Sequence, residues 1–313
     1  MIIVVALSFA AEAQAEERWA LVLSGASGGA KYAEQMGEWR TALTSALVDR
    51  YGFTADKVRV FVDETIKTGE PGTAANVRRA IGELRKQMTR EDLLLIILLG
   101  HGSYDGDTAK FNLVGPDLTA TDWAGLLNGV PGRLVVVNTT AASFPFLERL
   151  AGQNRIVITA TDSAAQKYAT VFPDYFAKAM REASSDLDKN GRTSIFEVFA
   201  ATSAAVKQHY EQRGQLTTER AVFDDNGDGV GRESEAPGPD GSLARLLYLD
   251  AESPAAANNP ELAALIRRRR ELEAEAEALK LKKAVMPATA WTAEYEKLMI
   301  ELAKVSREIR TKS

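Results

Sequence analysis

The 313-residue sequence contains no cysteine and only two histidines. Without cysteine the chain can form no disulfide bond, no thiolate metal site and no thiol nucleophile. Basic residues are not in excess, since the net charge is −5 and the isoelectric point lies near 5.4. This acidic balance argues against a general nucleic-acid-binding protein. No apolar stretch approaches the roughly 20 residues of a membrane-spanning helix, so we expect no transmembrane segment.

What the sequence does contain is the composition of a soluble globular protein, with 45% hydrophobic and 26% charged residues. Short apolar runs bounded by turn residues alternate with segments of helical periodicity, which is typical of an α/β fold with a parallel sheet. The predicted strands cover residues 19–24, 58–62, 93–99, 134–137 and 156–159. Helices are expected at residues 34–49 and 74–88, and a final strand is expected within residues 241–250.

Two of these strands end in residues that can carry chemistry. The run at residues 93–99 ends in Gly100-His101-Gly102, and the run at residues 134–137 ends in Asn-Thr-Thr-Ala-Ala-Ser. In open α/β sheets the functional residues gather just beyond the carboxyl ends of the strands. We therefore expect His101 to face the loop at residues 138–143, where it could act as a general base toward Thr140 or Ser143.

A buried strand that ends in His-Gly, followed by a strand that ends in a small-residue loop, resembles the caspase-like cysteine peptidases, and most closely the legumain type. The resemblance covers residues 19–250 and implies a caspase-like α/β sandwich with a mostly parallel sheet and helices on both faces. It places Ala141 where the family has its nucleophilic cysteine, and Phe144 where the family usually has glycine. The chain thus resembles a member of the family that has lost its thiol.

The resemblance leaves three functions open. The favoured one is a non-catalytic pseudopeptidase that binds a peptide or protein partner. The second is a hydrolase in which Thr140 or Ser143 acts with His101 as base, although an alcohol is far harder to activate than a thiol. The third is a scaffold that acts through a C-terminal helical hairpin. In the family the neighbouring strand end contributes to the substrate pocket, so the resemblance implies that Asp162 and Ser163 line such a pocket. The alternative role of these two residues is to cap a helix that starts near Thr170.

The segment at residues 186–197 has the spacing of an EF-hand calcium loop. Oxygen-bearing residues stand at positions 1, 3, 5, 9 and 12, glycine stands at position 6, and the residue at position 7 would ligate through its carbonyl. The predicted ligands are Asp186, Asp188, Asn190, Arg192, Ser194 and Glu197. Calcium prefers six to eight hard oxygen ligands, which this set supplies. The alternative is an ordinary loop rich in Asp, Asn and Gly.

A second acidic loop repeats the first half of this pattern. Its candidate ligands are Asp224, Asn226, Asp228 and Glu235. No helical pattern follows it, because residues 234–241 hold two prolines and two glycines. The second loop is therefore a weaker candidate for calcium, and it could simply be exposed.

The two ends of the chain differ in composition from the middle. Residues 1–15 resemble a bacterial secretory signal with an Ala13-Gln14-Ala15 cleavage site, although a first buried strand is the alternative. A signal predicts a periplasmic or secreted protein.

Residues 16–250 form the predicted caspase-like domain, residues 251–260 a linker, and residues 261–313 an antiparallel helical hairpin that could also mediate homo-oligomers. The hairpin prediction follows from apolar 3-4 spacing at Leu262, Leu265, Leu272, Ala276 and Leu279, and at Tyr295, Leu298, Leu302, Val305 and Ile309.

Overall fold

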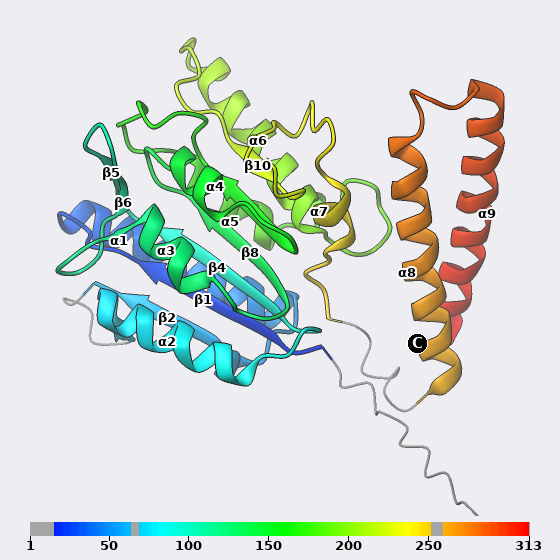
Figure 1. The fold of residues 1–313 in the computed structure, drawn as a ribbon, viewed down its shortest axis with the longest axis horizontal. Coiled ribbons are helices and arrows are strands. Elements are labelled where there is room, and N and C mark those ends of the chain that lie inside the picture. Colours follow the sequence, from blue (N-terminus) through cyan, green and yellow to red (C-terminus); the bar gives the residue numbers. More distant parts are fainter. Residues whose placement is uncertain (1–15, 64–68, 252–258, 313) are drawn as a thin grey trace, which may run out of the picture.

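The computed structural model describes residues 16–63, 69–251 and 259–312, so the predicted signal at 1–15 and most of the predicted linker lie outside it. Its centre is a seven-stranded sheet in the order β10-β9-β8-β4-β1-β2-β3 (Figure 1). The strands are β1 (Arg18–Ser24), β2 (Val58–Val62), β3 (Glu70–Pro71), β4 (Leu93–Leu99), β8 (Arg133–Asn138), β9 (Arg155–Thr159) and β10 (Val222–Asp224). All neighbours are parallel except β10, which runs antiparallel to β9 at one edge.

Strand β4 lies in the middle of the sheet because it is apolar on both faces. Every residue of Leu93–Leu99 is fully buried. Side chains alternate along a strand, so Leu93, Leu95, Ile97 and Leu99 enter one hydrophobic cluster and Leu94, Ile96 and Leu98 enter the other. A strand without a polar face can only be placed between two layers of helices.

Helices cover both faces of the sheet, as predicted (Figure 1). One layer holds α1 (Ala30–Ser45), continued by the π-helical η1 (Ala46–Arg50), and α5 (Phe172–Arg181), α6 (Ile195–Gln212) and α7 (Ser242–Leu246). The other layer holds α2 (Ala74–Gln87), α3 (Ala120–Leu127) and α4 (Phe144–Leu150). Short 3-10 turns lie at η2 (Ala55–Lys57) and η3 (Ala183–Ser185). The mixed α/β sandwich with a mostly parallel sheet is thereby confirmed.

A small antiparallel sheet follows directly after the central strand. It consists of β5 (Gly102–Tyr104), β6 (Ala109–Phe111) and β7 (Leu118–Thr119). Its first strand begins at the residue after His101, so this histidine sits where the chain passes from one sheet to the other. Helix α3 then starts with a capping box formed by Thr119 and Asp122.

The C-terminal hairpin consists of α8 (Pro260–Leu281) and α9 (Ala288–Lys312), which stand beside the sandwich near α7 (Figure 1). Leu262, Ile266 and Ile309 form its own small hydrophobic cluster, with Leu265 and Val305 packed against them. The predicted helical hairpin is therefore present. Among the described residues, none of the helices combines the length and the hydropathy that crossing a membrane would require.

The prediction of a final strand within residues 241–250 is wrong. The structure has the short helix α7 there, and only Tyr248 makes an isolated antiparallel bridge, to Ser194. The helix forms because the Asp225 carboxylate accepts hydrogen bonds from the backbone amides of Gly241 and Ala244, at 2.8 and 2.7 Å. A cap supplied from sixteen residues away has no local sequence signal.

Candidate functional site

The predicted site residues meet at the carboxyl edge of the parallel strands. His101 follows β4, residues 139–143 follow β8, and Asp162 and Ser163 follow β9. Because β8 pairs with both β4 and β9, these three loops are neighbours in the sheet. The sequence-based expectation that this edge gathers the polar residues therefore agrees with the arrangement of the strands.

The His101 ring is held by two contacts from the segment after β1. Its Nε2 lies 3.0 Å from the backbone carbonyl oxygen of Ser27, and the ring of Tyr32 packs edge-on against it at 4.7 Å between centroids. A carbonyl oxygen only accepts, so Nε2 carries the proton and Nδ1 keeps its lone pair in the neutral ring. The imidazole is thus fixed with Nδ1 as the atom that could take up a proton.

The carbonyl that orients His101 is itself positioned by a carboxylate. The Ser27 amide donates to Asp63 Oδ2 at 2.9 Å, and both side chains are buried. Asp63 stands at the end of β2, one strand further along the same edge. Sequence reasoning missed Ser27, Tyr32 and Asp63. Ser27 and Asp63 carried only the signal that each follows a predicted strand, and Tyr32 lies in the first turn of α1.

The His101-Gly102 segment touches the loop after β8. A Cβ atom added at Gly102 would lie 2.2 Å from the carbonyl oxygen of Ala141 and 2.4 Å from Oγ1 of Thr140. The Ala141 side chain is buried, and Ala142 has a left-handed backbone with φ of 51°. Such a conformation is uncommon for a residue other than glycine. The two strand ends are thus in direct contact, and the loop turns sharply just after Ala141.

We expect Gly102→Ala to destabilise the protein, because the added methyl group would overlap backbone atoms of the neighbouring loop. Overpacking of this kind typically costs about 1–3 kcal/mol. The matched control is Gly125→Ala, since a Cβ atom at Gly125 of α3 meets no atom within 4 Å and alanine favours a helix by up to about 1 kcal/mol over glycine. Chemical denaturation measures both. Equal stabilities of the two variants would contradict the close contact at Gly102.

Both candidate hydroxyl groups of the loop are committed to partners other than His101. The Thr140 hydroxyl donates to Asn138 Oδ1 at 2.8 Å, with the Ala141 carbonyl oxygen 3.1 Å away. The Ser143 hydroxyl lies 3.0 Å from the hydroxyl of Thr161. Within the described residues, neither hydroxyl forms a hydrogen bond with His101. A nucleophile needs its base within hydrogen-bond reach, so this arrangement does not assemble a hydroxyl-histidine pair.

Asp162 lines a cavity of about 510 Å³ at the same edge of the sheet. The cavity also contacts Phe144 and Glu148 of α4 and the segment with Arg232 and Glu233. The Asp162 carboxylate lies 4.0 Å from Nη1 of Arg220. Ser163 instead accepts a hydrogen bond from the Ala165 amide at 3.1 Å. Asp162 is therefore the better placed of the two predicted pocket residues.

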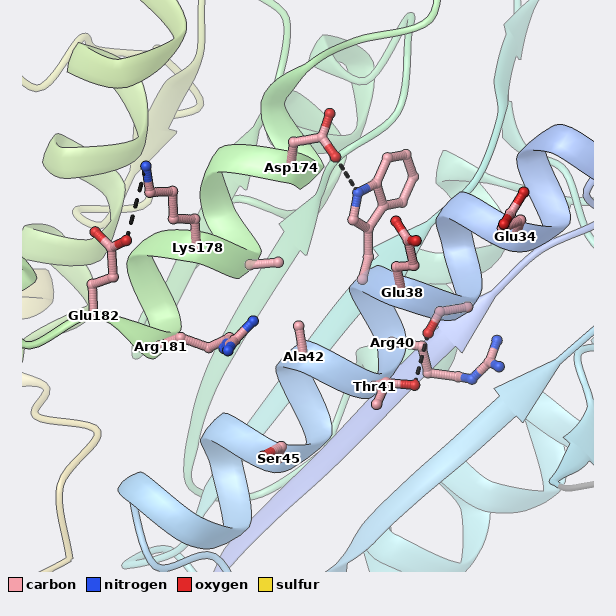
Figure 2. A pocket seen from close by; sticks show the side chains of 13 residues that line it. Glu34, Glu38, Arg40, Thr41, Ala42, Ser45, Asp174, Lys178, Arg181 and Glu182 are labelled. Carbon is pink, nitrogen blue, oxygen red and sulfur yellow. Dashed lines mark hydrogen bonds and ion pairs between the residues drawn. The ribbon is translucent and has the colours of Figure 1, made fainter.

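A larger groove of about 1080 Å³ lies between α1 and α5 (Figure 2). Trp39 of α1 donates to the Asp174 carboxylate of α5, and Lys178 and Glu182 form an ion pair along the far rim. None of the predicted site residues lines this groove. It combines charges of both signs, with carboxylates at Glu38 and Asp174 and an ammonium group at Lys178, and it lies apart from the strand edge that carries His101.

The first acidic loop brings its carboxylates together. Asp186, Asp188 and Glu197 each offer a carboxylate oxygen, and these oxygens lie within 4.8 Å of one another. Gly191, at position 6, has φ of 85°, which is a left-handed conformation that glycine adopts readily. The Asn190 side-chain oxygen accepts from the Arg192 amide at 2.8 Å, and the Ser194 hydroxyl donates to Glu197 Oε2 at 2.8 Å. The donor set and the turn fit a cation that prefers oxygen ligands.

Glu197 also closes the capping box at the start of α6. Its carboxylate accepts hydrogen bonds from the amides of Leu187 and Ser194, at 2.9 and 2.8 Å. The chain around Ser194 pairs with Tyr248 as an isolated bridge, with Leu249 donating to the Thr193 carbonyl oxygen at 2.9 Å. The residues after position 7 therefore pair with the segment after α7 rather than with the second acidic loop.

In the second acidic loop the carboxylates mostly bind the backbone. Asp224 accepts from the amide of Gly227 at 2.7 Å and from that of Gly229, and burial raises the pKa of this carboxyl. The Asn226 side chain accepts from the Asp228 amide at 2.8 Å. Glu235 lies apart in an exposed ion pair with Lys207 at 3.0 Å. Sequence reasoning missed the buried Asp240 beside this loop, where burial raises its pKa to about 6.

The chain is similar to known proteins at low sequence identity. No protein-family model matches the chain. Metacaspase-4 of Arabidopsis thaliana is 28% identical over 110 residues, which cover 31% of this chain and only 26% of metacaspase-4. A crystal structure of a protein from Geobacter sulfurreducens has 14% identity and a TM-score of 0.44, covering 73% of this chain and 96% of that one. Caspase-1 from Spodoptera frugiperda has 8% identity and a TM-score of 0.45, covering 67% and 87%. The chain is thus similar, over part of its sequence, to a metacaspase.

Proposed function

We propose that this protein is a pseudopeptidase of the caspase-like, legumain-type class that binds a peptide or protein partner without cleaving it. One observation carries the proposal. The strand edge keeps an oriented imidazole at His101, whereas position 141, in the loop that contacts Gly102, is an alanine. A caspase-like mechanism needs a thiolate at that place. Loss of the nucleophile leaves binding intact and removes several orders of magnitude of rate.

The hydrolase alternative finds no support in the hydrogen bonds of the loop. Thr140 would have to leave Asn138, and Ser143 would have to leave Thr161. Both side chains are almost completely buried, so each change would need rearrangement of the loop. The scaffold alternative, in which the hairpin is the working part, stands beside the pseudopeptidase proposal and does not exclude it.

We propose that the first acidic loop binds calcium and thereby stabilises the fold. Asp186, Asp188, Asn190, Ser194 and Glu197 would supply side-chain oxygens, and Arg192 its carbonyl oxygen. The clustered carboxylates and the left-handed turn at Gly191 support this proposal. The second acidic loop stays a weaker candidate. A calcium-binding protein suits the proposed periplasmic or secreted location, because calcium is abundant outside cells.

The partner-binding proposal is tested with a displayed peptide library. We expect wild-type protein to enrich peptides that it binds and leaves intact, as mass spectrometry of the recovered peptides would show. Asp162→Lys reverses a charge in the cavity beside the site and should weaken binding of the enriched peptides by at least about tenfold, or about 1.4 kcal/mol. Glu294→Lys makes the same charge change on the exposed surface of α9 and is the control. Recovered cleavage products, or equal effects of the two variants, would contradict the proposal.

A further inference from the structure

The hairpin is attached to the sandwich by polar contacts more than by a shared core. Its hydrophobic cluster at Leu262, Ile266 and Ile309 is separate from the two clusters of the sandwich, which include no described residue of α8 or α9. Charged pairs join the two parts, among them Arg245 of α7 with Glu277 of α8 at 3.7 Å. Leu272 and Ala276 of α8 are buried as well, yet neither belongs to a hydrophobic cluster of the sandwich. Relative motion of two such units is the ordinary expectation unless their interface is large and hydrophobic.

Arg192 forms the most buried of these links. Its guanidinium pairs with Glu273 of α8, and the two side chains are only 16% and 10% exposed. The same guanidinium stacks on Tyr248, with 3.4 Å between Cζ and the ring centroid. Arg269 adds a second cation, its Nε 3.8 Å from Glu273. The mostly buried Glu273 carboxylate therefore lies between two cationic side chains, one from the loop and one from its own helix.

Arg192 also belongs to the first acidic loop, at position 7. The loop and the hairpin enclose a common cavity of about 440 Å³, which Asp188 and Glu197 line from one side and Tyr295 and Met299 from the other. Glu273 of α8 lines the same cavity as Asp188 and Glu197 of the loop, so the three carboxylates border one enclosed space. A change in the charge of the loop therefore changes the electrostatic environment of the contact that holds the hairpin.

We propose that α8 and α9 form a movable arm latched to the sandwich by Arg192, and that a divalent cation in the loop tightens this latch. The inference rests on the cation site proposed above. Without a cation, Asp188 and Glu197 add their negative charges to the cavity that Glu273 also lines. With a cation those charges are neutralised, and the Arg192 carbonyl is held toward the ion while its side chain reaches the hairpin. Linkage then requires that docking of the arm strengthens cation binding by the same factor.

The absence of cysteine makes the test direct, because introduced thiols can be labelled selectively. Ala204→Cys on α6 and Ala278→Cys on α8 place spin labels on exposed positions of the two parts. Pulsed dipolar spectroscopy on the full chain then compares calcium with a chelator. We expect a narrow distance distribution with calcium and a broader one without it, and Arg192→Gln should give the broad distribution in both conditions.

Calcium titration calorimetry provides the reciprocal measurement. Glu273→Gln keeps every proposed ligand of the loop, yet it should weaken calcium binding by at least about fivefold, in the range of typical coupling energies. Arg268→Gln is the control, because Arg268 pairs with Glu271, Glu275 and Glu301 inside the hairpin. It should leave both the distances and the affinity unchanged.

The outcomes separate the latch from the site on which it rests. Glu197→Gln could abolish the heat of calcium binding while neither calcium nor Arg192→Gln changes the distances. This result would overturn the latch and leave the cation site standing. Arg192→Gln could change the distances while Glu273→Gln leaves the calcium affinity unaltered. This result would keep the latch but would contradict the proposal that the cation tightens it. The absence of calcium heat in the folded wild-type protein would overturn the cation site and the latch together.

Discussion

A cysteine introduced at position 141 should acquire the reactivity of a peptidase nucleophile, whereas the wild-type protein should cleave no peptide. An ordinary thiol has a pKa near 8.5, and a neighbouring imidazole lowers it to 7 or below. At neutral pH this change raises the thiolate fraction on the order of tenfold. Ala141→Cys should therefore react with iodoacetamide about tenfold faster than the same thiol in an Ala141→Cys, His101→Ala background. Stopped reactions analysed by mass spectrometry give both rates.

Two controls limit the interpretation of that experiment. The His101→Ala background keeps the introduced thiol at the same position of the loop and removes the imidazole, so the ratio of the two rates reports the effect of His101. Ser143→Cys puts a thiol in the same loop but beside Thr161, and it should stay unreactive. A faster reaction at position 143 than at position 141 would mean that the nucleophile position has been assigned to the wrong residue. Equal rates with and without His101 would show that the histidine does not serve this loop.

Calcium should raise the melting temperature of the wild-type protein, and Glu197→Gln should remove the rise. A ligand present at a hundredfold excess over its dissociation constant stabilises the native state by about 2.7 kcal/mol. For a chain of this size such a gain corresponds to roughly 4 °C. Glutamine can still close the capping box with Ser194, so the variant should fold and should melt near the wild-type temperature in chelator. Differential scanning calorimetry measures the four conditions.

The second acidic loop supplies the matched comparison for this prediction. Glu235→Gln removes a carboxylate that pairs with Lys207 on the surface, and it should leave the calcium-dependent rise intact. The reverse result, a rise abolished by Glu235→Gln and kept by Glu197→Gln, would move the cation from the first loop to the second. A melting temperature that calcium leaves unchanged in the wild-type protein would refute calcium stabilisation altogether.

The sequence alone determined the features that depend on short-range patterns. The run Leu93–Leu99 is apolar on both faces, so it had to become a central strand. The histidine that follows this run was bound to lie at the carboxyl edge of the sheet, and this position by itself made His101 a candidate site residue. The regular spacing of residues 186–197 brought their oxygens together because the ligands lie within one turn of the chain. The apolar 3-4 spacing likewise predicted both helices of the hairpin.

Only the tertiary structure decided what those residues touch. His101 is oriented by Ser27, which is 74 positions away, and Arg192 is paired with Glu273, which is 81 positions away. The Thr140 hydroxyl donates to Asn138, only two positions away in its own loop, whereas the Ser143 hydroxyl lies against that of Thr161, 18 positions away on the next strand end. Contacts of this kind arise when the sheet and its loops assemble, and propensity and periodicity describe only neighbours along the chain. For that reason the sequence could locate a candidate site, whereas the folded chain determined which of its groups are available.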